Sequence, residues 1–213
     1  MTGWLTRITV ATHHRDIRRM LTDGQAQHRY LMRLVDDDLG EHPRRTAGLL
    51  YRIENIDATT TMLVQTAQEP RTERLPSSSL MAVQTRQIGP IIGALHPGRL
   101  VKYRIVANPT KRWGNSAAPE QQGKLRVLRG DSAQQWWIDR ADGHGLDINS
   151  TQWRPLPDVT VKRGRHAMAQ FDGTATVRDA AAVRDAILTG IGRARSYGCG
   201  LLSLALIKGL TDD

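Results

Sequence analysis

The stretch Val177–Ile207, "VRDAAAVRDAILTGIGRARSYGCGLLSLALI", has the pattern of a helix, a glycine-rich loop and a strand in succession. Ala180, Val183, Ile187 and Leu188 fall on one side of a helix, which predicts an amphipathic helix at its start. Four glycines follow, and the apolar run after them predicts a strand. The chain is therefore expected to end in helix, loop and strand.

The region before this stretch supplies the other elements of the same domain. The tripeptide His-Pro-Gly at 96–98 precedes an alternating strand in "RLVKYRIVA", and we place a domain boundary there. Asp131 is expected to cap a helix in "SAQQWWIDRAD" that ends at Gly143, and strands are expected in "DVTVKR" and "HAMAQF". The order strand, helix, two strands, helix, strand is that of a ferredoxin-like, or RRM-like, domain.

The first part of the chain shows a weaker version of this order. A strand is expected in "WLTRITVA", and Asp23 and Gly24 precede a helical segment, "QAQHRYLMRLVDD". "GLLYRIENI" and "TTTMLVQTA" predict a hairpin, and "AVQTRQIGPII" predicts a further strand. The intervening "EPRTERLPSSS" has the composition of a loop, so no second helix is visible. The sequence predicts an α+β protein with tandem ferredoxin-like domains and antiparallel sheets, residues 1–95 and 96–213.

Composition limits the partners. A formal net charge of +9 over 213 residues favours a polyanion, either nucleic acid or an anionic membrane surface, and nucleic acid is preferred. No run approaches the roughly 18 apolar residues of a membrane span, and no signal-peptide pattern opens the chain, so we expect a cytoplasmic protein without a membrane partner. The single cysteine, Cys199, and the lack of CxxC or HExxH motifs predict no metal, and we expect no cofactor.

The glycine-rich loop has two readings from its residues alone. Glycines can adopt positive φ and let backbone N–H groups approach an anion, and arginines add charge, so the loop can be a phosphate-binding one. A glycine-rich turn before a buried strand can also be purely structural. The residues concerned are Gly190, Gly192, Gly198 and Gly200, with Arg193 and Arg195.

Three segments resemble one family. "GIGRARSYGCGLLSLALI" resembles the C-terminal glycine-rich signature of the CasE family, the endoribonucleases that process CRISPR repeat RNA in type I-E Cascade systems. "RLVKYRIVANPTKR" is similar to the segment that opens this family's second domain, and "TRITVA" with "HRYLMRLV" is similar to its first strand and catalytic helix. The resemblance implies two ferredoxin-like domains. It also implies partners, namely the CRISPR repeat RNA hairpin and other Cascade subunits.

The reaction that the resemblance implies is metal-independent. A ribose 2'-hydroxyl attacks the adjacent phosphate and leaves a 2',3'-cyclic phosphate and a 5'-hydroxyl. A histidine suits this chemistry because its ordinary pKa lies near neutral pH. The family helix indicates His28 as the catalytic residue.

Helical periodicity supports that choice. His28 lies at the edge of an apolar arc, with a basic face further round that can hold phosphate and stabilise transition-state charge. The arc is Leu31, Leu34 and Val35, and the basic face is Arg29 and Arg33. Many family members have a tyrosine where this chain has Gln25, and Tyr30 falls on roughly the opposite side of the helix. The identity of the general base is therefore open: it is either His28, assisted by arginines, or a group from another part of the chain.

Two further basic segments are candidate RNA contacts. "VKRGRH" predicts a hairpin tip that enters the groove of an RNA stem, as a hairpin of this region does in the family, although a solvated β-turn is nearly as good a reading. "ANPTKR" matches a family position that faces RNA. These candidates are Lys162, Arg163 and Arg165 around Gly164, and Lys111 with Arg112.

Two other functions remain open from the sequence. The first is a non-catalytic subunit that only holds an RNA hairpin; a chain with one phenylalanine lacks the aromatic strands of ordinary RRM domains. The second is a basic enzyme acting on a small phosphorylated metabolite. Of the pair Trp136 and Trp137, one is expected to pack into the core, and Cys199 is expected to be a small packed residue.

Overall fold

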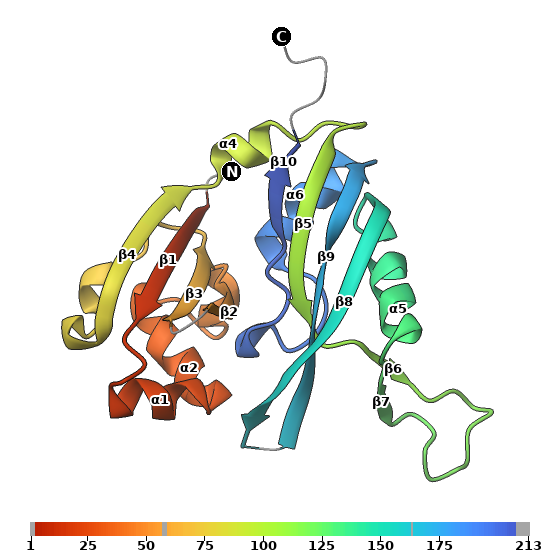
Figure 1. The fold of residues 1–213 in the computed structure, drawn as a ribbon, viewed down its shortest axis with the longest axis horizontal. Coiled ribbons are helices and arrows are strands. Elements are labelled where there is room, and N and C mark those ends of the chain that lie inside the picture. The colour runs from red at the N-terminus through yellow and green to blue at the C-terminus, as the bar shows by residue number, and fades with distance from the viewer. Residues whose placement is uncertain (1–2, 57–58, 163, 208–213) are drawn as a thin grey trace.

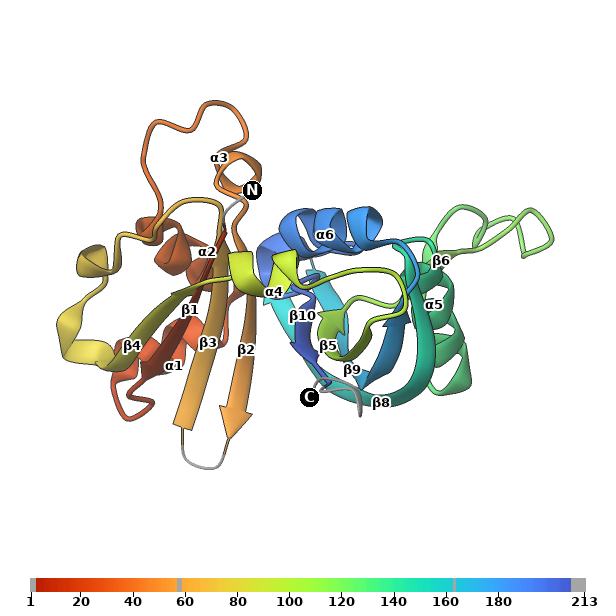
Figure 2. The same cartoon turned by 90° about the horizontal axis from the view of Figure 1, so that it is seen from above.

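The computed structural model describes residues 3–56, 59–162 and 164–207 and contains two four-stranded sheets that stand side by side (Figures 1 and 2). The strand orders are β2-β3-β1-β4 and β10-β5-β9-β8, and every pairing is antiparallel. In each sheet the first strand lies between the third and the fourth, which is the ferredoxin-like arrangement. The predicted α+β fold with antiparallel sheets is confirmed. Within the described residues, no helix has the length and apolar character needed to span a membrane.

The N-terminal sheet is built from the predicted strands. Its strands are β1 (Trp4–Val10), β2 (Leu50–Ile56), β3 (Thr59–Thr66) and β4 (Leu80–Gln87). Four α-helices accompany it: α1 (Arg15–Leu21), α2 (Gly24–Leu31), α3 (Pro43–Thr46) and α4 (Gly89–Gly93). Between β3 and β4 the described chain forms only the 3₁₀ turns η2 (Thr72–Arg74) and η3 (Ser77–Ser79), so the segment read as a loop contains no α-helix.

Three N-terminal predictions were wrong in detail. Helix α1 was not predicted, although Ile17 and Met20 are buried at helical spacing. Helix α2 begins at Gly24 and ends at Leu31, so it is shorter than the predicted helix, and the turn η1 (Met32–Leu34) follows it. The helix ends there because the chain turns toward η2, where the Arg71 amide donates to the Leu34 carbonyl at 2.8 Å. The last predicted strand stops at Gln87, since the following proline sits in the first turn of α4.

The C-terminal sheet contains the longest strands. Its strands are β5 (Leu100–Ala107), β8 (Leu146–Val161), β9 (Gly164–Val177) and β10 (Ser203–Leu206), and its helices are α5 (Asp131–Asp142) and α6 (Ala180–Thr189). A separate arm pairs β6 (Thr110–Arg112) with β7 (Leu125–Val127). Strands β8 and β9 extend well beyond the two short strands predicted there. Asp131 is the first helical residue and Gly130 holds the capping position, so the predicted Asp131 cap is wrong.

Each sheet has its own hydrophobic core. The N-terminal core includes Ile8, Leu31 and Met62, all fully buried, and the C-terminal core includes Trp137 and Phe171. Trp136 is partly exposed beside that core, as expected of one member of the pair. The residues around α4 pack into the C-terminal core, although α4 directly follows β4, a strand of the N-terminal sheet. The predicted boundary between residues 95 and 96 stays a prediction.

Side chains of the N-terminal half hold the two halves together. The Gln65 Nε2 donates to the Ile187 carbonyl at 2.7 Å, which satisfies a carbonyl in the last turn of α6. The Tyr51 hydroxyl contacts the Ser196 carbonyl at 3.2 Å, and the Arg52 guanidinium donates to the Ser203 hydroxyl at 3.0 Å. The glycine-rich loop is therefore fixed against β2.

Candidate active site

Helix α2 carries the predicted catalytic histidine at the junction of the two halves. The Asp23 side chain caps the helix by accepting from the Gln25 amide at 2.8 Å. Gln27 is buried; its amide donates to the Leu21 carbonyl at 2.8 Å. Its Oε1 lies 3.3 Å from the Tyr51 hydroxyl, whose single proton is shared between this oxygen and the Ser196 carbonyl. Because Tyr51 also contacts Ser196, one buried hydroxyl lies between the histidine helix and the glycine-rich loop.

Of the predicted faces, only His28, Arg29 and Leu31 lie on α2, because the helix ends at Leu31 and the chain continues as the turn η1. Leu31, Leu34 and Val35 are buried, Arg29 and Arg33 are exposed, and His28 is half-buried between them. Tyr30 is buried. Gln25 is exposed on the first turn.

The surroundings of His28 favour its neutral form. Burial lowers the pKa of the imidazole from its ordinary 6.5, and the nearby charge of Arg44 lowers it further. The Nδ1 atom is buried and has no hydrogen-bond partner within the described chain. At neutral pH the ring is therefore mostly unprotonated, which is the form that can accept a proton.

Arg44 lies near His28, and two further arginines lie near Arg44, one of them from the C-terminal half. Burial lowers the pKa of the Arg44 guanidinium, and the nearby charges of Arg195 and Arg45 lower it further. Arg44 is fixed by a bond from its Nη1 to the Leu49 carbonyl at 3.0 Å. We call His28, Arg44, Arg45 and Arg195 the histidine site.

Sequence reasoning missed two members of this site. Arg44 and Arg45 lie on α3, a single turn within a polar connection, and no periodic pattern relates them to His28. The only local signal is the run "HPRRT", in which a proline opens the turn. Arg195, by contrast, was a candidate; its Nη1 donates to the Thr189 carbonyl at 2.8 Å.

The glycine-rich loop adopts the conformations that were predicted. Gly190, Gly192, Gly198 and Gly200 all have positive φ, between 77° and 89°. The amides of Gly190 and Gly200 donate to the carbonyls of Ala186 at 3.0 Å and Val106 at 2.8 Å. These two glycines thus shape the loop and offer no free N–H to a phosphate. Phosphate contacts by the rest of the loop stay a prediction.

The basic hairpin reaches α2. A Cβ added to Gly24 would lie 2.9 Å from Val159 in β8 and 3.1 Å from Tyr197 in the loop, which shows how closely the three segments pack. His166 of β9 stacks on Tyr197 with ring centroids 5.2 Å apart, and burial and the charge of Arg193 lower its pKa. Among the predicted tip residues, Lys162, Gly164 and Arg165 are exposed, and Arg163 lies outside the described residues.

The other candidates lie elsewhere. Lys111 and Arg112 are on β6, far from α2 across the C-terminal half (Figure 1). Together with Arg193 they line a separate hollow beside α5. The structure therefore gathers His28 and Arg195 into one site with the hairpin nearby, and assigns Lys111, Arg112 and Arg193 to a second surface.

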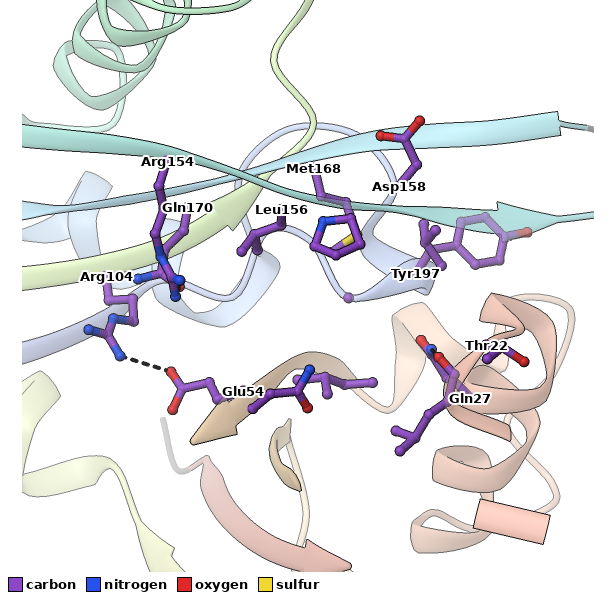
Figure 3. A pocket seen from close by; sticks show the side chains of 16 residues that line it. Thr22, Gln27, Glu54, Arg104, Arg154, Leu156, Asp158, Met168, Gln170 and Tyr197 are labelled. Atoms are coloured by element: carbon purple, nitrogen blue, oxygen red, sulfur yellow. Dashed lines mark hydrogen bonds and ion pairs between the residues drawn. The ribbon is translucent and has the colours of Figure 1, made fainter. Parts of the chain in front are cut away.

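A cleft of about 510 Å³ separates the hairpin from β2 and α1 (Figure 3). Its charges are balanced: Arg104 pairs with Glu54 at 3.2 Å and with Asp172, and Arg154 donates to Gln170 at 2.7 Å. Arg104 is neutralised by two carboxylates, so it makes a poor phosphate ligand. The cleft therefore does not favour an enzyme of small phosphorylated metabolites.

Cys199 is fully buried, and burial raises the pKa of its thiol to about 12, so it is a packed residue as expected. Within the described residues, no cluster of three or more His, Cys, Asp or Glu side chains is arranged to hold a metal ion.

Two antiparallel ferredoxin-like sheets with cations around a half-buried histidine define a tandem ferredoxin-like protein with a surface suited to nucleic acid. The chain belongs to the family described as "CRISPR associated protein", whose sequence model matches residues 3–205. This confirms the family resemblance found in the sequence.

Named relatives agree with it. The chain is 29% identical over 174 residues to the "CRISPR system Cascade subunit CasE" of Escherichia coli, covering 76% of this chain and 84% of the relative. It is 28% identical over 221 residues to the "CRISPR-associated endoribonuclease Cse3" of Thermus thermophilus, covering 95% and 99%. The structure of the Thermus thermophilus Cse3 bound to an RNA representing a pre-cleavage complex matches with a TM-score of 0.81 and 27% identity, over 96% of this chain and 100% of that chain.

Proposed function

We propose that this protein is an endoribonuclease that cleaves CRISPR repeat hairpins in precursor RNA and stays bound to the product as a Cascade subunit, in the cytoplasm. The observation that carries the proposal is the histidine site, where burial and the charge of Arg44 favour a neutral His28 imidazole and Arg195 of the C-terminal half lies near Arg44. The relatives named an endoribonuclease and a Cascade subunit support the substrate class and the assembly.

The proposed reaction needs one proton acceptor and charge stabilisation. Because Nδ1 of His28 is buried, Nε2 is the ring nitrogen that takes the proton from the ribose 2'-hydroxyl. The 2'-oxygen then bonds to phosphorus while the bond to the 5'-oxygen breaks, and the imidazolium returns its proton to that leaving oxygen. Arg44 and Arg195 stabilise the negative charge that grows on the phosphate oxygens. Gln25 takes no part in proton transfer.

Binding is assigned to basic side chains. Phosphate contacts set affinity and register, while the A-form shape of the hairpin and its single-stranded ends supply recognition. The proposed RNA-contacting residues are Arg29, Arg33, Lys111, Arg112, Lys162, Arg163, Arg165, Arg193 and Arg195.

The test is a single-turnover incubation in EDTA with the repeat hairpin RNA, using the parent protein, His28→Ala and the control His13→Ala. His13 is an exposed histidine before α1, so its variant loses the same side chain from a different surface. We expect cyclic-phosphate products from the parent and the control, and binding without cleavage from His28→Ala. Cleavage by His28→Ala at the parent rate would refute the catalytic role.

The alternative function is a subunit that holds the hairpin without cutting it. Gln25 in place of a tyrosine is the observation that favours it. Tight, salt-sensitive binding by the parent with no cleavage at any protein concentration would identify this case.

A further inference from the structure

A second basic hollow lies on the C-terminal half, away from the histidine site. It has a volume of about 700 Å³ and lies between the β6–β7 arm, α5 and the glycine-rich loop. Five cations line it, and we call this surface the arm groove. The cations are Lys111, Arg112, Arg126, Arg140 and Arg193.

The charges of the arm groove are not balanced by the protein. Among the described residues that line it, Asp139 alone is acidic, and it accepts a hydrogen bond from Gln135 at 2.8 Å. Within the described part of the chain, none of the five cations forms an ion pair with a carboxylate. Like charges gathered in a hollow repel one another and attract an anion with several charges. The arm groove thus differs from the cleft between the halves, where the arginines are engaged.

Aromatic rings hold some of these guanidinium groups in position. Arg126 lies over the ring of Trp113, 4.5 Å from its centroid, and Arg140 lies 5.7 Å from the centroid of Trp136. Trp136 also lines the groove while its ring packs near Phe171, with centroids 6.1 Å apart. Positioned cations beside an aromatic side chain are typical of surfaces that bind single-stranded nucleic acid.

The glycine-rich loop contributes one arginine to the histidine site and another to the arm groove. Arg195 lies close enough to Arg44 to lower its pKa, whereas Arg193, two residues earlier, lines the groove. The charge of Arg193 also acts on His166 of the hairpin. A strand of RNA that leaves the histidine site across this loop therefore meets Arg193 and then the arm groove.

We propose that the arm groove binds the single-stranded RNA that flanks the repeat hairpin, through its phosphates, with one base against Trp136. This inference rests on the proposed function, because that function supplies the RNA. A single strand fits better than a stem, since its unstacked bases can reach an aromatic side chain in a hollow whereas a duplex keeps them inside.

The experiment compares two RNAs and three proteins. The RNAs are the bare repeat hairpin and the same hairpin with its single-stranded flanks, both with a 2'-deoxy substitution at the cleavage site so that only binding is measured. The proteins are the parent, Arg126→Gln/Arg140→Gln, and the charge-matched control Arg7→Gln/Arg86→Gln on β1 and β4. All four arginines are exposed, so the variants keep their cores, which circular dichroism verifies.

We expect the parent to bind the flanked hairpin roughly tenfold more tightly than the bare one, the scale of a stacked base. The groove variant loses this difference, and its salt slope for the flanked RNA falls by about 0.7 per lost phosphate contact. The control retains both. If the groove variant lost the same affinity for both RNAs, the inference would be overturned, because the groove would then contact the stem. No effect on either RNA would overturn it in favour of an acidic protein partner.

Failure of the proposed function is separable from failure of this inference. If the parent does not bind or cut the bare hairpin, the proposed function fails. If it cuts the unmodified bare hairpin but gains nothing from the flanks, the assignment of the arm groove alone fails.

Discussion

Gly200→Ala is expected to destabilise the protein more than Gly192→Ala, although both glycines have nearly the same backbone conformation. Their φ angles are +89° and +85°, so an alanine at either position costs about 1–2 kcal/mol for a left-handed backbone. A Cβ at Gly200 would also lie 2.9 Å from the Ile191 carbonyl oxygen and 2.9 Å from Cγ of Arg195. At Gly192 the nearest other atom is Cη2 of Trp136, at 3.8 Å.

The extra contact sets the expected difference. Backbone oxygen cannot rotate away, so Gly200→Ala adds an overpacking cost of about 1–3 kcal/mol, for a total of about 2–5 kcal/mol. Urea unfolding of the parent and both variants gives the two losses directly. Because the same Cβ displaces Arg195, cleavage by folded Gly200→Ala should also fall well below that by Gly192→Ala. Equal losses of stability in the two variants would refute the steric argument.

Three more predictions concern single side chains. Arg44→Gln is expected to raise the pKa of His28, which stays below 6.5 because burial is the larger cause of its shift. The acidic limb of the plot of cleavage rate against pH should therefore move to higher pH, and the maximal rate should fall. An acidic limb at the same pH in the variant would contradict this. Glu54→Gln removes the carboxylate that lies 2.8 Å from Nε of Arg52, whose side chain is only 4% exposed. The free energy of unfolding in guanidinium should fall by about 3 kcal/mol, because the Arg52 charge stays buried without its partner. A loss under about 1 kcal/mol would show that the other partners of Arg52 suffice. Cys199 should resist iodoacetamide in the folded protein and react after unfolding, and rapid labelling of native protein would oppose its burial.

Folding stability should follow pH in a defined direction through His28. Its pKa in the folded protein is below the ordinary 6.5, so the unfolded chain binds more protons between those two pH values. Stability is therefore lost as pH falls from 6.5 to the folded pKa. Unfolding titrations of the parent and His28→Ala measure this contribution as the difference between their pH slopes.

Periodic and local signals predicted most of the fold. Alternation and turn residues indicated the strands, and the order of elements indicated the ferredoxin-like topology, because both depend on neighbours in sequence. The length of β8 and β9 was underestimated, since much of β8 is exposed and carries a proline at 155 that interrupts the pattern. Helix α1 was missed although its buried residues had the right spacing.

The histidine site was only partly predictable for a different reason. The position of His28 on α2 follows from one helix, but its neighbours Arg44 and Arg195 reach it from separate turns, and only the packed structure relates those turns. Tyr51 could be placed in a strand, yet its contacts with Gln27 and Ser196 join three segments. Long-range contacts of this kind leave no local pattern in a single sequence.

Two of the hydrogen bonds that join the two halves depend on residue type at the donor positions but not at the acceptor positions. Gln65 and Tyr51 supply side-chain donors from the N-terminal half, whereas their acceptors at Ile187 and Ser196 are main-chain carbonyls. Every residue type has such a carbonyl, so position 196 can vary without losing its bond, while position 51 cannot. Substitutions on the accepting side, such as at position 196 in the glycine-rich loop, can therefore leave the joint between the halves intact.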